Sequence, residues 1–182
     1  MRNDRNDLEK VIVSEAEIGQ RVKELGERLT GEYEGRNPVV LGILKGANVF
    51  VADLVRAMDI ELQMDFIMLA SYGASDTPGE VRVKMDCETE LAGRHVLVVD
   101  DIVDTGQTLK ALMELLRMRG AASVRSCVLL DKPSRRTVEL EPDYKGFEIE
   151  DDFVVGYGLD YAERFRNLRE VCAIKKRVYA VE

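Results

Sequence analysis

Three aspartates follow the most apolar run of this 182-residue chain within five positions. The run 96–99 leads directly into Asp100 and Asp101, and Asp104 comes just before the sequence Thr-Gly-Gln-Thr at 105–108. Carboxylates are costly to bury without partners, so their position needs a reason. Because parallel α/β sheets bind ligands outside the carboxyl ends of their strands, we expect a ligand-facing rim here.

The order of residues in this segment suits a sugar phosphate and a hard cation. Successive strand residues point to opposite faces, so Asp100 and Asp101 would flank a ligand, accept hydrogen bonds from hydroxyls and assist Mg²⁺. Gly106 allows close backbone approach, and free N–H groups with the hydroxyls of Thr105 and Thr108 would form an anion site. The spacing is not that of a Walker A loop. A single aspartate at this position would usually serve only as a helix cap. Three aspartates together with T-G-x-T favour a ligand site over capping alone.

Strand-like and helix-like segments alternate around this motif. Ser14 and Glu17 form a capping box for a helix over residues 14–30, which Gly31 is expected to stop. Further helices are expected at 47–58 and 108–119, and strands at 39–44, 62–71, 94–99 and 124–130, with an antiparallel strand at 81–85 after a polar loop at 72–80. The order and the apolar strands predict one α/β domain with a mostly parallel sheet covered on both faces.

The last third of the chain has a different pattern. Four short strand-like segments are expected after residue 131, at 147–149, 153–157, 171–174 and 178–181. They predict a small β-rich subdomain instead of another strand–helix–strand unit.

Composition narrows the class of protein. A formal net charge of -8 weighs against non-specific binding to nucleic acid or membranes. The N-terminus lacks the apolar region of a secretory signal and no apolar run would span a bilayer, so a cytoplasmic protein is expected. Three cysteines at 87, 127 and 172 form no zinc-like or redox pair, which favours free thiols in a reducing compartment. The single histidine, His95, is expected to be structural.

Several segments resemble one enzyme family. VLVVDDIVDTGQTL at 96–109 closely resembles the phosphoribosyl-diphosphate (PRPP) motif of type I phosphoribosyltransferases. LGILKGANVF at 41–50 resembles their pyrophosphate loop, and DFIMLASYG at 65–73 the strand before their flexible catalytic loop. LLDKPSRR at 129–136 and residues 146–171 resemble the purine-binding half of hypoxanthine-guanine phosphoribosyltransferases. The likeness covers roughly residues 8–182.

This resemblance implies a type I phosphoribosyltransferase fold. A core, roughly residues 35–135, would carry a hood formed by the first few residues and roughly 136–182. The implied activity is purine salvage, a Mg²⁺-dependent transfer of 5-phosphoribosyl from PRPP to N9 of hypoxanthine or guanine that gives IMP or GMP and pyrophosphate. A homodimer or homotetramer is also implied.

The resemblance also assigns roles to residues. Asp104 would be the general acid or base near purine N7, with Asp100 and Asp101 beside the ribose hydroxyls and Mg²⁺. The Lys132 amino group would donate to the 6-oxo atom of the base. Phe153 would stack on the base, and the Val154 backbone would contact its Watson–Crick edge. PRPP and pyrophosphate would contact Lys45, Gly46, Ser71, Tyr72, Thr105, Gly106, Gln107, Thr108 and Arg166, and Asp160 would hold a second Mg²⁺.

Two positions depart from the family pattern. Position 107 is often lysine in relatives and is glutamine here, so backbone N–H groups must carry more of the phosphate binding. Position 100 is often glutamate and is the shorter aspartate here.

Two alternatives stay open at this point. The same enzyme class could prefer xanthine or guanine, which kinetics with each base would decide. A non-catalytic RNA-binding regulator on the same fold would need a basic face, which the charge of -8 disfavours.

Overall fold

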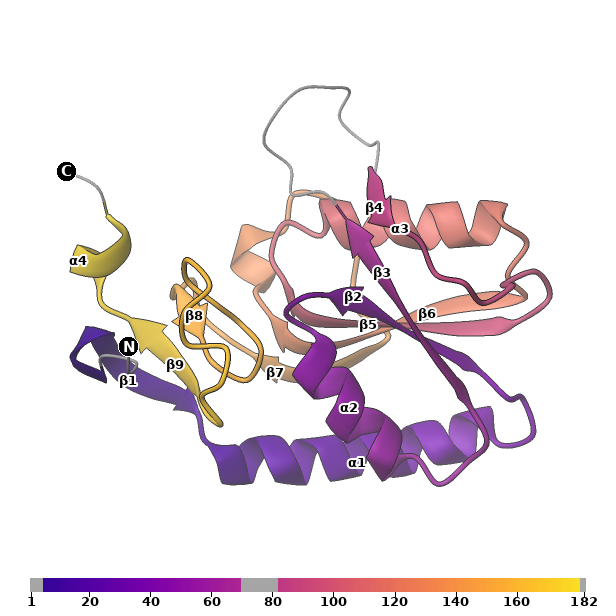
Figure 1. Cartoon of the computed structure of the whole chain (residues 1–182), viewed down its shortest axis with the longest axis horizontal. Coiled ribbons are helices and arrows are strands. Elements are labelled where there is room, and N and C mark those ends of the chain that lie inside the picture. Colours follow the sequence, from indigo (N-terminus) through magenta and orange to yellow (C-terminus); the bar gives the residue numbers. More distant parts are fainter. Residues whose placement is uncertain (1–4, 70–81, 181–182) are drawn as a thin grey trace.

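The computed structural model describes residues 5–69 and 82–180, and its central feature is a six-stranded sheet (Figure 1). The strand order is β4-β3-β2-β5-β6-β7, and every pair is parallel except β3 with β4. Its strands are β2 (Val39–Leu44), β3 (Gln63–Leu69), β4 (Val83–Met85), β5 (His95–Val103), β6 (Ser123–Asp131) and β7 (Tyr144–Glu148). The expected mostly parallel sheet is therefore confirmed.

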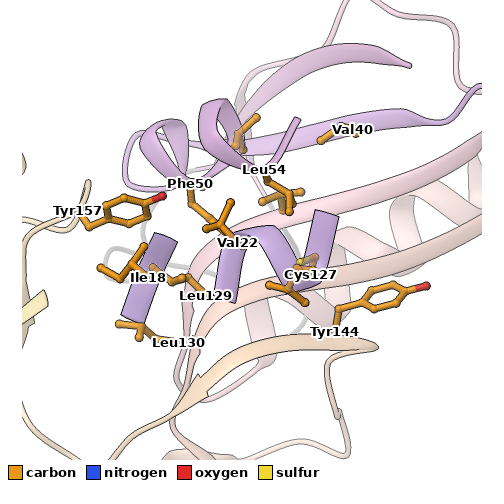
Figure 2. Close-up of a cluster of buried hydrophobic side chains, with 14 of the residues drawn as sticks. Ile18, Val22, Val40, Phe50, Leu54, Cys127, Leu129, Leu130, Tyr144 and Tyr157 are labelled. Atoms are coloured by element: carbon orange, nitrogen blue, oxygen red, sulfur yellow. The ribbon is translucent and has the colours of Figure 1, made fainter. Parts of the chain in front are cut away.

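Three long helices cover the two faces of this sheet. They are α1 (Glu15–Tyr33), α2 (Asn48–Ala57) and α3 (Gln107–Met118). α1 and α2 pack together below the sheet in Figure 1, and α3 lies above it. Successive side chains of β5 point to opposite faces of the sheet and so contribute to two hydrophobic clusters. Leu97 and Val99 belong to the cluster with α1 and α2, while Val96 and Val98 belong to the cluster with α3. Figure 2 shows the first cluster.

The expected start of α1 is confirmed and its expected end is wrong. Glu17 N–H donates to Ser14 Oγ at 3.3 Å, and Ser14 N–H donates to Glu17 Oε2 at 2.9 Å. The helix continues through Gly31 to Tyr33, whose side chain is buried together with Leu29. Burying a large apolar side chain contributes about 1.5–3 kcal/mol, which exceeds the roughly 1 kcal/mol cost of glycine inside a helix.

A second, three-stranded antiparallel sheet, which we call the hood, has the order β1-β9-β8. Its strands are β1 (Leu8–Val13), β8 (Val154–Val155) and β9 (Val171–Ile174), flanked by the short helices η1 (Arg5–Asp7) and α4 (Lys176–Tyr179). The hood has its own buried cluster, which includes Val155 and Phe165. A further short helix, η2 (Pro133–Arg135), follows β6.

The tail differs from expectation in three places. The segment expected at 147–149 belongs to β7, which pairs parallel with β6 in the large sheet, where Tyr144 is buried. The strand expected at 178–181 is wrong, because α4 occupies Lys176–Tyr179 and the Ala180 N–H donates to the Lys176 carbonyl. The strand expected at 153–157 shortens to β8, since Tyr157 has a φ of 50°.

The remaining expectations concern cysteines, His95 and membranes. Cys87, Cys127 and Cys172 are all free thiols. The His95 Nδ1 atom lies 2.8 Å from Ser123 Oγ, which joins β5 to β6 and agrees with a structural role. Within residues 5–69 and 82–180, no helix combines the length and apolarity needed to cross a membrane.

Candidate active site

The predicted aspartates lie inside β5, because this strand continues to Val103 beyond its expected end at residue 99. Its pairing with β6 runs to Val103 and Asp131, whereas its pairing with β2 ends at Val99. Asp100 and Asp101 therefore border the place where β2 has separated from β5, although β2 stays paired with β3 through Leu44. Because α2 and α3 leave on opposite faces, this is also the switch point where such sheets bind ligands.

Asp100 and Asp101 form a crowded pair of carboxylates. The Asp101 N–H donates to Asp100 Oδ1 at 3.0 Å, and the Ile102 N–H donates to Asp101 Oδ1 at 2.9 Å. Burial raises the pKa of Asp100 well above its usual value, and the charge of Asp101 raises it further. Burial also raises the pKa of Asp101, where the charge of Arg166 acts in the opposite direction. Two desolvated neighbouring carboxylates of this kind fit a bound cation.

The turn between β2 and α2 lies directly against this pair. A Cβ atom on Gly46 would be 1.6 Å from Asp101 Oδ2, so only glycine allows this approach. A Cβ atom on Gly158 would be 2.0 Å from the Gly46 carbonyl oxygen, which brings the loop after β8 to the same point. The peptide bond between Leu44 and Lys45 is cis. The predicted pyrophosphate loop and PRPP motif thus meet, as expected.

One carboxylate joins the two predicted pyrophosphate cations. Lys45 Nζ lies 3.0 Å from Glu163 Oε1, and Arg166 Nε and Nη2 each lie 3.3 Å from Glu163 Oε2. Hydrogen bonds from these cations lower the pKa of Glu163. Asp160 completes the group, because its Oδ1 pairs with Arg166 Nη2 at 2.8 Å and its Oδ2 accepts the Glu163 N–H at 2.8 Å. Sequence reasoning missed Glu163, for which no spacing signal exists.

The predicted phosphate loop begins α3. Gly106 caps the helix with a φ of 82°, a left-handed conformation that favours glycine. The Gln107 backbone N–H donates to Thr105 Oγ1 at 3.4 Å, and the Gln107 side-chain amide donates to Thr137 Oγ1 at 3.1 Å. Thr108 is the second residue of α3. Position 107 therefore faces Thr137, where the family pattern would often present a lysine.

Sequence reasoning also missed a cation beside this loop. The Arg136 Cδ atom lies 2.8 Å from where a Gly106 Cβ would be, and its Nη2 pairs with the buried Asp131. Its Nε atom is buried and has no hydrogen-bond partner in the part of the chain that the structure describes. The sequence signal was weak, because Arg136 belongs to the quoted segment LLDKPSRR but has no diagnostic spacing.

The predicted base-binding residues Asp104 and Lys132 directly follow β5 and β6, at the same carboxyl-terminal edge of the sheet as the phosphate loop. Lys132, 6% exposed, donates from Nζ to the Asp152 carbonyl at 2.7 Å and lies 3.6 Å from Asp104 Oδ1. This Asp104 oxygen is buried without a hydrogen-bond partner among the described residues. Phe153 is 39% exposed, and the next residue, Val154, pairs with Ala173 in the hood. The predicted Ser71 and Tyr72 lie outside the described residues.

Comparison with known proteins decides the family. A model of the phosphoribosyl transferase domain matches residues 11–162. The hypoxanthine-guanine phosphoribosyltransferase of Lactococcus lactis is 53% identical over 173 residues, which are 94% of each chain. The chain belongs to the hypoxanthine-guanine phosphoribosyltransferase family. The family member from Bacillus subtilis is 49% identical over 96% of this chain and 98% of its own.

Solved structures confirm the fold of this family member. A hypoxanthine phosphoribosyltransferase from Staphylococcus aureus superposes with a TM-score of 0.93 at 42% identity, over 100% of both chains. The expected type I phosphoribosyltransferase fold is therefore correct. The chain spans only 27% of the length of the bifunctional protein TilS/HprT from Listeria monocytogenes, to which it is 49% identical.

Proposed function

We propose that this phosphoribosyltransferase salvages purines by Mg²⁺-dependent transfer of 5-phosphoribosyl from PRPP to N9 of hypoxanthine or guanine, giving IMP or GMP and pyrophosphate. One observation carries the proposal: the buried Lys132 amino group lies 3.6 Å from Asp104 Oδ1, which accepts no hydrogen bond from the described residues, and the partly exposed Phe153 ring follows Asp152, whose carbonyl Lys132 binds. A planar base with one acceptor and one titratable ring nitrogen suits this arrangement.

Lys132 would select the base by hydrogen bonding. Its amino group is a donor only, so it can bind a 6-oxo oxygen but not a 6-amino group. Adenine would leave the Lys132 N–H group that points at the base without an acceptor, which costs more than the loss of an apolar contact. Phe153 would stack on the ring, and the Val154 backbone would meet its Watson–Crick edge.

Asp104 would move a proton at purine N7. Its Oδ1 atom accepts no hydrogen bond from the described residues and, 3.6 Å from Lys132 Nζ, lies within reach of a ligand held by Lys132. The backbone N–H groups of residues 105–108, at the start of α3, would hold the 5′-phosphate. Asp100 and Asp101 would stabilise positive charge that develops on the ribose as pyrophosphate leaves.

The donor set suits Mg²⁺, which usually binds one or two carboxylates together with water and substrate oxygens. Among residues 5–69 and 82–180, no three His, Cys, Asp or Glu side chains are grouped to hold a metal alone. Asp100 and Asp101 would hold one ion, which when bound would neutralise the leaving pyrophosphate. Asp160 would hold a second only after its contacts with Arg166 and Glu163 open.

The test is an assay with PRPP and Mg²⁺ and each of hypoxanthine, guanine, xanthine and adenine. We expect product from the first two and none from adenine. A strong preference for xanthine would replace the proposed substrates within the same class. Tight RNA binding with no nucleotide product from any base would refute the proposal. A cytoplasmic homodimer or homotetramer remains a prediction.

A further inference from the structure

The Phe153 ring is covered on one of its faces. The Tyr179 ring lies 4.9 Å from it, centroid to centroid, with an angle of 24° between the planes, so the two rings are stacked. Tyr161 meets Phe153 in a T-shaped contact at 5.7 Å and 88°. Phe153 nevertheless keeps 39% of its surface exposed. A planar ligand can therefore stack only on the face opposite Tyr179.

Tyr179 belongs to a helix that other segments hold in place. α4 has only four residues, too few to be stable in isolation. The Tyr161 hydroxyl donates to the Val178 carbonyl at 2.9 Å. Arg177 Nη2 donates to the Asn6 carbonyl at 3.0 Å and pairs with Asp7 Oδ1 at 3.2 Å. These contacts fix α4 beyond β9, at the outer end of the hood (Figure 1).

The stacked pair lies next to the predicted donor for the base. Lys132 Nζ binds the carbonyl of Asp152, the residue that precedes Phe153. The hydrogen-bonding group Lys132 and the stacking ring of Phe153 are therefore linked in space through Asp152. An exposed phenyl ring that was free to rotate would lose that freedom when a base bound, whereas a ring already stacked on Tyr179 loses less.

We propose that Tyr179 is a positioning residue for the purine base: it holds the Phe153 ring from one side so that the base stacks on the other. This inference rests on the proposed function. Aromatic pairs contribute enough beyond their buried area to change an affinity about 3- to 10-fold. That effect falls on the base and not on PRPP, because none of the described contacts of Tyr179 involves residues 45–46 or 105–108.

The test compares Tyr179→Ala with Tyr179→Phe, which keeps the ring, and with Val11→Ala. Val11 is a matched control, since it is an exposed apolar residue of β1 in the hood, which α4 flanks. We expect Tyr179→Ala to raise the KM for hypoxanthine and the Kd for IMP about 3- to 10-fold, with the KM for PRPP and kcat within twofold of wild type. Tyr179→Phe and Val11→Ala should match wild type.

Other results would overturn the inference. An unchanged hypoxanthine KM, or equal rises in both KM values, would leave Tyr179 with a structural role only. A fall in the hypoxanthine KM would mean that Tyr179 covers the face that the base needs. Tyr179→Leu keeps apolar bulk in the hood, so it gives the same readout if the alanine variant fails to fold. Wild-type protein that makes no product from any base would refute the proposed function instead.

Discussion

Gly46→Ala should disable the site while leaving the fold intact. The new methyl group would lie 1.6 Å from Asp101 Oδ2, where ordinary contact begins at 3.4 Å, so the two groups must separate by about 1.8 Å. A displacement of roughly 1 Å at a reacting centre can cost about 100-fold in rate. We therefore expect kcat/KM for PRPP to fall at least about 100-fold. The atom displaced is the end of a side chain, so the loss in unfolding free energy should stay within about 1–3 kcal/mol.

The assay is steady-state kinetics with PRPP varied at saturating hypoxanthine, alongside thermal unfolding. Gly19→Ala is the matched control, because Gly19 is exposed on α1 and a Cβ atom there would meet nothing within 4 Å. This control should keep full activity and gain about 1 kcal/mol, or roughly 2–4 °C in Tm. A Gly46→Ala enzyme within about fivefold of wild type, with a normal Tm, would refute the claim that this approach positions Asp101.

Four further outcomes are expected. Asp104→Asn should lower kcat about 100-fold or more with little change in the KM for PRPP, and unchanged turnover would remove Asp104 from proton transfer. EDTA should abolish activity and added Mg²⁺ should restore it, whereas full activity in metal-free buffer would contradict the metal requirement. Because the pKa of Asp100 is raised in the folded state, ionisation of this carboxyl destabilises the folded state as pH rises through that pKa. Asp100→Asn should therefore raise Tm by a few degrees at pH 7 and by much less near pH 4. An equal rise in Tm at both pH values would contradict this reasoning. Glu163→Gln should strengthen inhibition by pyrophosphate two- to fivefold by freeing Lys45 and Arg166, while Glu15→Gln, which removes a comparable exposed charge paired with Arg169, should not.

The parts of the site that the sequence predicted are local. Asp100, Asp104 and the loop at 105–108 lie within nine positions, so one strand and one helix start determine their arrangement. The capping box of α1 is equally local, and it was correct. Short, nearly continuous apolar runs likewise identified each parallel strand of the large sheet before β7, with errors confined to the ends.

The parts that were missed depend on distant contacts. β5 continues to Val103 because β6 pairs with it there, which the composition of β5 does not reveal. β7 joins the large sheet because Tyr144 is buried against α1 and β6. Glu163 reaches Lys45, 118 positions away, from a left-handed turn with a φ of 60°. Such pairings follow from the packed fold, and a single sequence gives no measure of them.

The hood has a consequence for the order of folding. β1 pairs with β9, so Leu8 meets Ile174, whereas neighbouring strands of the large sheet are joined by far shorter connections. Contacts between residues so far apart form slowly, because the long intervening loop must close first. During synthesis β1 emerges before β9 and can pair with it only after the residues between them have been made. The part of the chain that carries the proposed phosphate site can thus assemble while the hood, which carries the proposed purine site, still lacks a partner strand. A nascent or partly folded chain would then acquire the proposed base specificity last.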